Sequence, residues 1–61
     1  QALSLLEEIV EAEPQNPLFR YHLGMVYLKT DARRLALASL KTALELGIDE
    51  EYRAEIRKVM R

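Results

Sequence analysis

The spacing of apolar residues is the feature that most restricts how this chain folds. Apolar side chains recur at three- and four-residue steps along the sequence, which is the period of an amphipathic helix. No stretch shows the alternation that is typical of a half-buried strand. Pro14, Pro17 and Gly47 interrupt the pattern, which therefore predicts an all-α fold of four helical segments joined by short breaks.

The first break combines the end of one helix with the start of the next. Pro14 is expected to end the first helix, because proline disfavours the helical conformation of the residue before it. Asn16 is a good cap for free backbone amides. Pro17 suits the first helical position, since the N–H that it lacks would have no partner there.

The later breaks predict an antiparallel hairpin followed by a short last helix. The second helix is expected to end near Thr30, and Asp31 to cap the third helix. Gly47 is expected to end the third helix with a left-handed C-terminal cap. Asp49 is expected to cap the fourth. The second and third segments are the best-supported pair of antiparallel helices.

Each predicted helix has one apolar face, and we expect these faces to form the core. Helix by helix, they are Ala2, Leu3, Leu5, Leu6, Ile9 and Val10; Leu18, Phe19, Leu23, Val26, Tyr27 and Leu28; Leu35, Ala36, Leu40, Ala43 and Leu44; and Tyr52, Ile56, Val59 and Met60.

Length and charge exclude several classes of protein. The chain has 61 residues and no cysteine, so it is at most one small domain without disulfides. Its 9 basic and 10 acidic residues are balanced, whereas a nucleic-acid-binding protein needs a basic face. No apolar run approaches the roughly 18 residues of a membrane span. We therefore expect no nucleic-acid or membrane partner, and nothing in the sequence indicates a compartment.

The sequence also contains an internal repeat. A shift of about 34 residues places the first helix on the third without a gap. The superimposed pairs are Ala2 and Ala36, Leu3 and Leu37, Leu6 and Leu40, Ile9 and Ala43, Val10 and Leu44, and Glu11 and Glu45.

A second pattern occupies the middle of the chain. It consists of Leu23-Gly24, Tyr27, Ala36, Leu40 and Ala43. Gly24 and Ala36 are small where two helices cross closely, and Leu40 is expected to fill the core from the second helix of the pair. In the same register as the repeat, this pattern resembles the signature of the tetratricopeptide family.

The resemblance implies a helix-hairpin solenoid with right-handed superhelical stacking of antiparallel helices. Residues 1–14 would be the second helix of a preceding repeat, residues 15–48 one complete repeat, and residues 49–61 a C-terminal capping helix. On this view we interpret the chain as part of a longer array. It departs from the family pattern at Arg20, where tryptophan is preferred, and at Ile48, which replaces a second closing proline.

The resemblance also implies a binding surface, because family members bind peptides on the concave face lined by the first helix of each repeat. The predicted partner-binding residues are Leu18, Tyr21, His22, Met25, Leu28 and Lys29. Only Lys29 matches the clamp that some members use for a terminal carboxylate, so we do not expect that activity. The expected function is a scaffold module that binds a peptide or helix of a partner protein; alternatively, this stripe packs against a neighbouring helix or a second copy.

The sequence offers no chemistry for catalysis. His22 is the only histidine and there is no cysteine, so a Cys/His nucleophile or a multi-histidine metal site is excluded. There is no glycine-rich phosphate loop. The pairs Glu7-Glu8 and Glu50-Glu51 are expected to be solvated helix residues. We predict no enzyme activity, no cofactor and no metal.

Basic residues recur along the last helix at four-residue steps. Arg53, Arg57 and Arg61, with Lys58 nearby, form either a stripe for an acidic partner or a solvated face. The balanced charge of the whole chain favours the solvated face.

The segment 29–33 is the weakest of the predicted breaks. It contains neither glycine nor proline, so residues 17–46 can form one long helix. Two chains would then exchange helices and form a homodimer, as in domain swapping. A structural self-assembly unit is therefore the alternative function.

Overall fold

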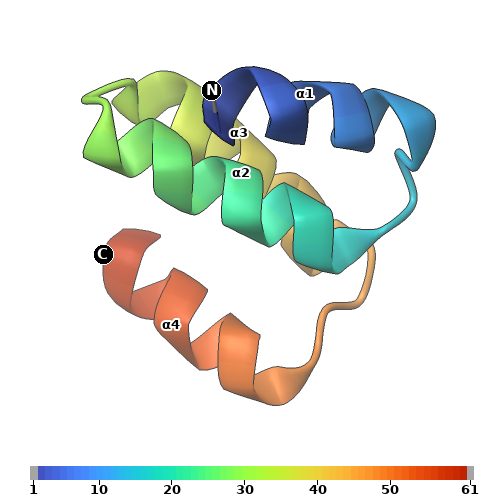
Figure 1. The fold of residues 1–61 in the computed structure, drawn as a ribbon. Helices are drawn as coiled ribbons and strands as arrows, with labels where there is room; N and C mark the ends of the chain where they lie inside the picture. The colour runs from blue at the N-terminus through green and yellow to red at the C-terminus, as the bar shows by residue number, and fades with distance from the viewer. Residues whose placement is uncertain (1, 61) are drawn as a thin grey trace.

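The computed structural model describes residues 2–60, and this part of the chain is all helical with no strand. It consists of α1 (Ala2–Ala12), α2 (Pro17–Lys29), α3 (Arg33–Glu45) and α4 (Glu50–Met60), as Figure 1 shows. The predicted all-α fold of four helices with short breaks is confirmed.

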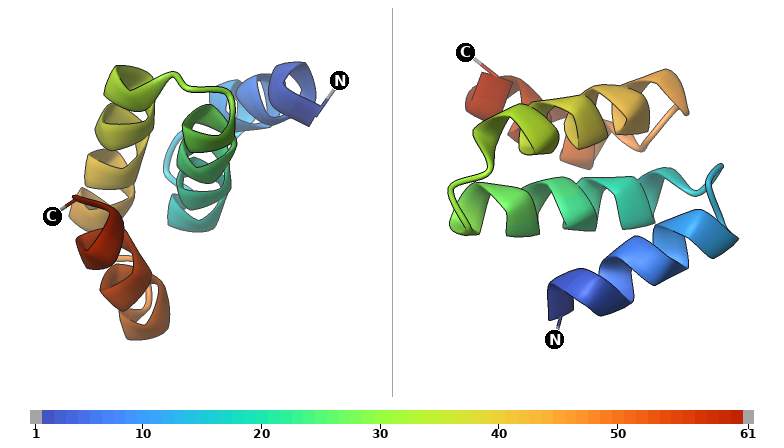
Figure 2. Two further views of the ribbon diagram at one scale, coloured as in Figure 1. Left: turned by 90° about the vertical axis from the view of Figure 1, so that its left-hand side faces the viewer. Right: turned by 90° about the horizontal axis from the view of Figure 1, so that it is seen from above.

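The helices pack in chain order, with α2 between α1 and α3 (Figure 2). The antiparallel pair α2–α3 has the most extensive contact, and α1 adds a second contact with α2. α4 lies beside α3, which it approaches less closely than α2 does. The hairpin of α2 and α3 is therefore the centre of the fold, and α1 and α4 cover it on either side.

The core consists of two clusters of buried side chains. Val10, Leu23, Tyr27 and Ala36 form the first; Leu40, Ala43, Ile48 and Ile56 form the second. Leu28 packs against both. Most of the predicted apolar faces point into these clusters.

Four residues of the predicted core faces are exposed instead: Leu18 (36%) and Met60 (39%) partly, and Leu5 and Leu35 more fully. Leu5 on α1 and Leu35 on α3 are 59% and 54% exposed. The prediction that these four residues lie in the core was wrong, and for Leu5 and Leu35 the reason is that no helix of the described chain covers their side. The other apolar residues of α1 and α3 already form one buried side of each helix at the helical period, so Leu5 and Leu35 are not needed for the core.

The crossing of α2 and α3 depends on Gly24. A Cβ atom at this position would lie 2.7 Å from both Cγ and Cδ2 of Leu40 and 3.2 Å from the carbonyl oxygen of Ala36. Leu40 and Ala36 are both fully buried, so neither has room to move away. The expected close approach of the two helices at Gly24 and Ala36 is confirmed.

The start of α2 has the predicted cap. The side-chain oxygen of Asn16 accepts hydrogen bonds from the N–H groups of Leu18 (3.1 Å) and Phe19 (3.4 Å). Pro17 is the first residue of the helix. Together they fix where α2 begins after the Pro14 turn.

The end of α3 has the left-handed cap predicted for Gly47, with φ at 84°. Its N–H donates to the Leu44 carbonyl (3.1 Å), and the N–H of Ile48 donates to the Ala43 carbonyl (3.3 Å). These are the two bonds of a Schellman motif. A proline at position 48 would lack the second donor, which gives a physical reason for the isoleucine there; its buried side chain joins the second core cluster.

The end of α2 has the same cap without a glycine. Asp31 takes the left-handed conformation, with φ at 64°. Its N–H donates to the Leu28 carbonyl (3.2 Å), and the N–H of Ala32 donates to the Tyr27 carbonyl (2.8 Å). The prediction that Asp31 caps α3 was wrong: Ala32 holds that position, and no side chain caps the helix. Asp31 instead closes α2 and turns the chain into the hairpin.

A fourth local feature holds α4 against the end of α3. The Asp49 carbonyl accepts the N–H of Arg53 (3.0 Å), which starts the helix at the predicted place. The Arg53 side chain donates through Nε to the Ile48 carbonyl (3.0 Å). Glu50 and Glu51 occupy the first turn, where the helix dipole favours anions.

The two left-handed caps predict opposite effects of substitution. Asp31→Gly should raise the free energy of unfolding by about 0.5–1 kcal/mol, because glycine adopts positive φ without steric cost. Gly47→Ala should lower it by about 1–2 kcal/mol. A Cβ at position 47 would meet no atom within 4 Å, so that loss would come from the backbone alone. Urea unfolding followed by circular dichroism measures both changes in stability. A destabilised Asp31→Gly variant would contradict the left-handed conformation of Asp31.

The crossing predicts that Gly24→Ala destabilises the protein. Overpacking against Leu40 should cost about 1–3 kcal/mol, of which the better helix propensity of alanine offsets about 1. Ala38→Gly on the exposed side of α3 is the control, since it measures the propensity difference without a steric contact. If Gly24→Ala stabilised the chain by the amount that Ala38→Gly costs, the close crossing would be wrong.

Candidate functional site

The stripe of α2 predicted to bind a partner divides into an inner and an outer part. Tyr21 and Leu28 are half-buried and pack against the second core cluster. Leu18, His22 and Lys29 are exposed, and Met25 is half-buried between them. The structure thus brings the six residues together on one helix, and four of them form its accessible side.

An aromatic contact joins this stripe to α4. The ring of Tyr21 lies 5.0 Å from the ring of Tyr52, at an interplanar angle of 60°. The His22 ring meets Tyr21 edge-on, with the centroids 5.5 Å apart. Tyr52 therefore covers one side of the stripe, and the inner residues stabilise the attachment of α4.

A shallow hollow of about 160 Å³ lies beside Leu18, where α2 begins and α4 begins. Pro17, Leu18, Gly47, Ile48, Asp49 and Tyr52 line it. Leu18, Ile48 and Tyr52 make part of the lining apolar, and Asp49 is the one acidic residue in it. The hollow is too small for a folded domain, but its size suits a single apolar side chain of a peptide.

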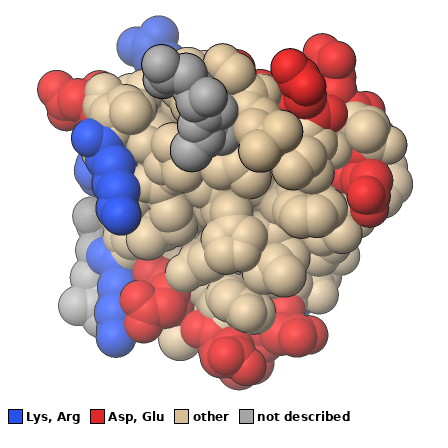
Figure 3. All heavy atoms as spheres, in the orientation of Figure 1, with Lys and Arg blue, Asp and Glu red and all other residues tan. Residues whose placement is uncertain are grey.

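Charged side chains surround this face rather than cross it. Figure 3, in the orientation of Figure 1, shows an uncharged area over α2 that extends toward α4. Most acidic side chains lie at the right and lower margins of this view, and most basic ones at the left margin, where some acidic side chains also occur. We call the accessible side of the predicted stripe the α2–α4 face; it consists of Leu18, His22, Met25 and Lys29 of α2, with Tyr52 of α4 beside them.

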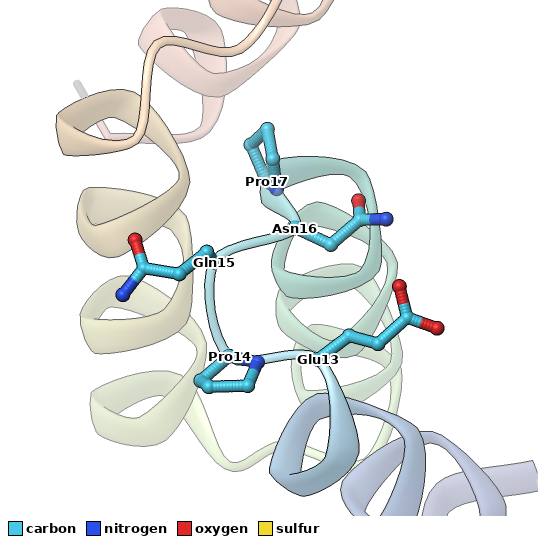
Figure 4. Close-up of a pocket in the computed structure, with 5 residues that line it drawn as sticks. All are labelled: Glu13, Pro14, Gln15, Asn16 and Pro17. Atoms are coloured by element: carbon cyan, nitrogen blue, oxygen red, sulfur yellow. The ribbon is translucent and has the colours of Figure 1, made fainter.

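A larger hollow beside the α1–α2 loop is not a functional site. It measures about 500 Å³ and is lined by Glu13, Pro14, Gln15, Asn16 and Pro17. Figure 4 shows that these side chains point in different directions, with Gln15 and Glu13 on opposite sides of the loop. Asn16 is already committed to capping α2. The hollow is the outside of a turn, and no group of side chains converges on it.

Glu7 has a partner that the sequence did not indicate. Its carboxylate accepts a hydrogen bond of 2.7 Å from the hydroxyl of Tyr27. The Tyr27 ring is buried in the first cluster, while its hydroxyl reaches the edge of the core. This bond raises the pKa of Tyr27, and burial and the negative charge of Glu7 raise it further. Glu7 thus connects α1 to α2 and is more than a solvated residue.

The basic residues of α4 have partners within the chain. Arg53 bonds to the Ile48 carbonyl, Arg57 pairs with Glu50 (3.4 Å), and Lys58 pairs with Glu55 (3.5 Å). Arg61 lies outside the described residues. Because the two ion pairs are exposed, each contributes at most about 1 kcal/mol. These contacts favour the solvated-face interpretation of the stripe.

Among residues 2–60, no group of three or more histidine, cysteine, aspartate or glutamate side chains is placed to hold a metal. No helix in the same range is both long and apolar enough to cross a membrane.

Comparison with known proteins does not identify a family. No family model matches the chain, and no curated protein or solved structure shows significant similarity to it. Any function proposed for this chain therefore depends on the geometry of the α2–α4 face.

Sequence reasoning missed the contribution of α4 to this face. Tyr52 was expected only as part of a core face, together with Ile56, Val59 and Met60. In the structure Ile56 is fully buried, Tyr52 contacts α2, and Met60 is 39% exposed. The helical period places Tyr52 and Ile56 on one side, but which helix they meet depends on the path of the 46–49 turn.

The Tyr27–Glu7 bond predicts a specific dependence on pH. Tyr27→Phe should lower the free energy of unfolding by about 1 kcal/mol at neutral pH. Because the folded-state pKa of Tyr27 is raised, the stabilisation is fully present below the unfolded-state pKa of about 10. It is lost as the pH rises through the folded-state pKa. The stability difference between wild type and Tyr27→Phe should therefore shrink above about pH 10.

Urea titrations of both proteins at a series of pH values measure this difference. Glu7→Gln is the control, since it keeps an acceptor for the hydroxyl but removes the charge. If the stability difference between wild type and Tyr27→Phe stayed constant through the alkaline range, the stabilisation would not come from a hydrogen bond that the neutral Tyr27 hydroxyl donates to Glu7.

Proposed function

We propose that this chain is a tetratricopeptide-type interaction module that binds a peptide or helix of a partner protein on the α2–α4 face. The observation that carries the proposal is an accessible, partly apolar face on the central helix, with Lys29 at one end and Asp49 and Glu50 near the other. Faces of this kind on soluble domains commonly mark interaction sites.

The packing of the hairpin supports the tetratricopeptide assignment. Gly24, Ala36 and Leu40 form the close crossing that the signature requires. α1 and α4 flank the hairpin in the order that a half repeat on each side implies. In such arrays the first helix of each repeat lines the binding surface, and under this proposal α2 and α4 would be those helices.

The face favours one orientation of a peptide. Asp49 and Glu50 are exposed at the end where α2 and α4 begin, and Lys29 is exposed at the end of α2. A bound segment would place an apolar side chain in the hollow beside Leu18. A basic residue of the peptide would lie near Asp49, and an acidic one near Lys29. The inner residues Tyr21 and Leu28 are half-buried against the second core cluster and support the face from below.

The expected affinity is modest. The accessible part of the face is a few side chains wide, well below the area of a standard protein interface. Ordering a flexible peptide also opposes binding. Dissociation constants in the micromolar range or weaker are therefore expected, and tighter binding would require several such units in one chain.

A matched pair of leucine variants tests the proposal. Random peptides displayed on phage are selected on the wild-type chain, and the enriched peptides are synthesised and titrated by calorimetry. Leu18→Glu should weaken binding by at least about 10-fold, because it places a charge beside the hollow. Leu35→Glu is the control: Leu35 is also an exposed leucine in the first turn of a helix, where the dipole tolerates glutamate, but it lies on α3.

The pattern of the two variants decides the outcome. Loss of binding with Leu18→Glu and retention with Leu35→Glu would support the α2–α4 face. Equal effects of both variants would contradict it, as would a selection that enriches no peptide above a blank surface.

A further inference from the structure

We propose that a second copy of this chain is a partner for the α2–α3 hairpin, by exchange of α3 and α4 across a hinge that is locally unfavourable in the closed form. The hinge is residues 29–33. The inference goes beyond peptide binding and does not depend on it, because the α2–α4 face would be present in each half of the exchanged dimer.

The first local cost in the hinge is the conformation of Asp31. It is the one residue other than glycine within 2–60 that has a positive φ, at 64°. Left-handed backbone is unfavourable for residues with a side chain, although aspartate tolerates it better than most. In a continuous helix Asp31 would take the ordinary right-handed conformation, and this cost would disappear.

The second cost is the start of α3. Ala32 holds the N-cap position, and no side chain bonds to the first amides of the helix. The first helical bond is donated by Ala36 to the Ala32 carbonyl (2.9 Å). In a continuous helix the amides of residues 33–35 would find carbonyl partners in residues 29–31. In the closed hairpin those amides precede the first helical bond and have no side-chain cap.

The third cost is electrostatic. α3 begins with Arg33 and Arg34 and has no acidic residue in its first turn. Cations at a helix N-terminus oppose the helix dipole. In a continuous helix both arginines would lie at its middle, where the dipole has little effect. All three costs therefore act against the closed hinge, whereas the continuous helix has only the low helix propensity of Thr30 and Asp31 against it.

Nothing in the hinge sequence prevents that helix, since it contains no proline or glycine. A helix over residues 17–45 would be about 43 Å long at about 1.5 Å per residue. Two such helices, antiparallel about a two-fold axis near residue 31, would place Gly24 of one copy against Leu40 of the other. The core contacts of α2 with α3 and α4 would then form between chains.

Closed monomers and exchanged dimers thus share one set of core contacts and differ mainly at the hinge. The hinge should control which form is populated, because its cost is relieved twice in each dimer. Two closed monomers keep the translational and rotational entropy that a dimer loses. The protein concentration should therefore decide the ratio of monomer to dimer.

Hinge variants test the proposal by molar mass. Each protein is refolded from urea at concentrations from micromolar to millimolar and measured by light scattering behind a sizing column. Wild type should contain dimer at the highest concentrations. Asp31→Ala should lower the dissociation constant of the dimer by about 10-fold or more, since alanine disfavours positive φ and favours helix.

Two further variants should have the opposite effect. Arg33→Pro suits the first position of α3 in the closed form but interrupts a continuous helix, so it should raise the dissociation constant by more than about 100-fold. Asp31→Gly should also favour the monomer, and it replaces Arg33→Pro should that variant fail to fold. Ala38→Gly weakens α3 equally in both forms and should leave the dissociation constant unchanged.

A distance measurement identifies the exchange itself. Since the chain has no cysteine, spin labels can be attached at His22→Cys and Lys41→Cys and diluted into unlabelled protein. Within one chain of the dimer, these positions would be about 28 Å apart along the helix. In the monomer they lie on neighbouring helices, whose axes are about 8–10 Å apart.

Three results would contradict the proposed exchange. An Asp31→Ala protein that stays monomeric at millimolar concentration would overturn the proposal. So would Arg33→Pro and Asp31→Gly variants that dimerise as readily as wild type, or a dimer with the short intrachain distance. The last two results would show that the copies meet through another surface.

Discussion

The close crossing of α2 and α3 at Gly24 is the contact on which the rest of the structure depends. Without a side chain at Gly24, Leu40 and the Ala36 backbone approach α2 closely enough to bury both residues completely. Each helix then has one further side available for packing, which α1 covers on α2 and α4 covers on α3. In so short a chain, this crossing supplies much of the area that can be buried.

The two Schellman caps connect the crossing to the remainder of the chain, but with different local cost. At Gly47 the left-handed residue is a glycine, and Ile48 follows it into the core. At Asp31 the same two hydrogen bonds form around a residue with a side chain, and α3 then starts without a cap. One end of α3 is therefore well determined, while its start is held in place mainly by tertiary packing. The uncapped start of α3 is therefore the place where the proposed exchange between two chains would begin.

The α2–α4 face follows from the same packing. Once α4 lies beside α3, Tyr52 contacts Tyr21, and the inner half of the α2 stripe becomes part of the core. Leu18, His22 and Lys29 remain exposed. The proposed recognition of a peptide thus uses only the outer part of a stripe that looks uniform in the sequence.

The sequence by itself determined the four helices, the Asn16 and Gly47 caps and the small residues at the crossing, because these depend on local backbone preference and on helical period. Only the tertiary structure decided that Leu5 and Leu35 are exposed, that Glu7 bonds to Tyr27 and that Tyr52 covers part of the predicted stripe. Periodicity says which side of a helix is apolar, but not whether another helix covers it. Asp31 shows the same limit within the backbone: its residue type fits either a cap or a left-handed turn, and the packing of α3 on α2 selects the turn.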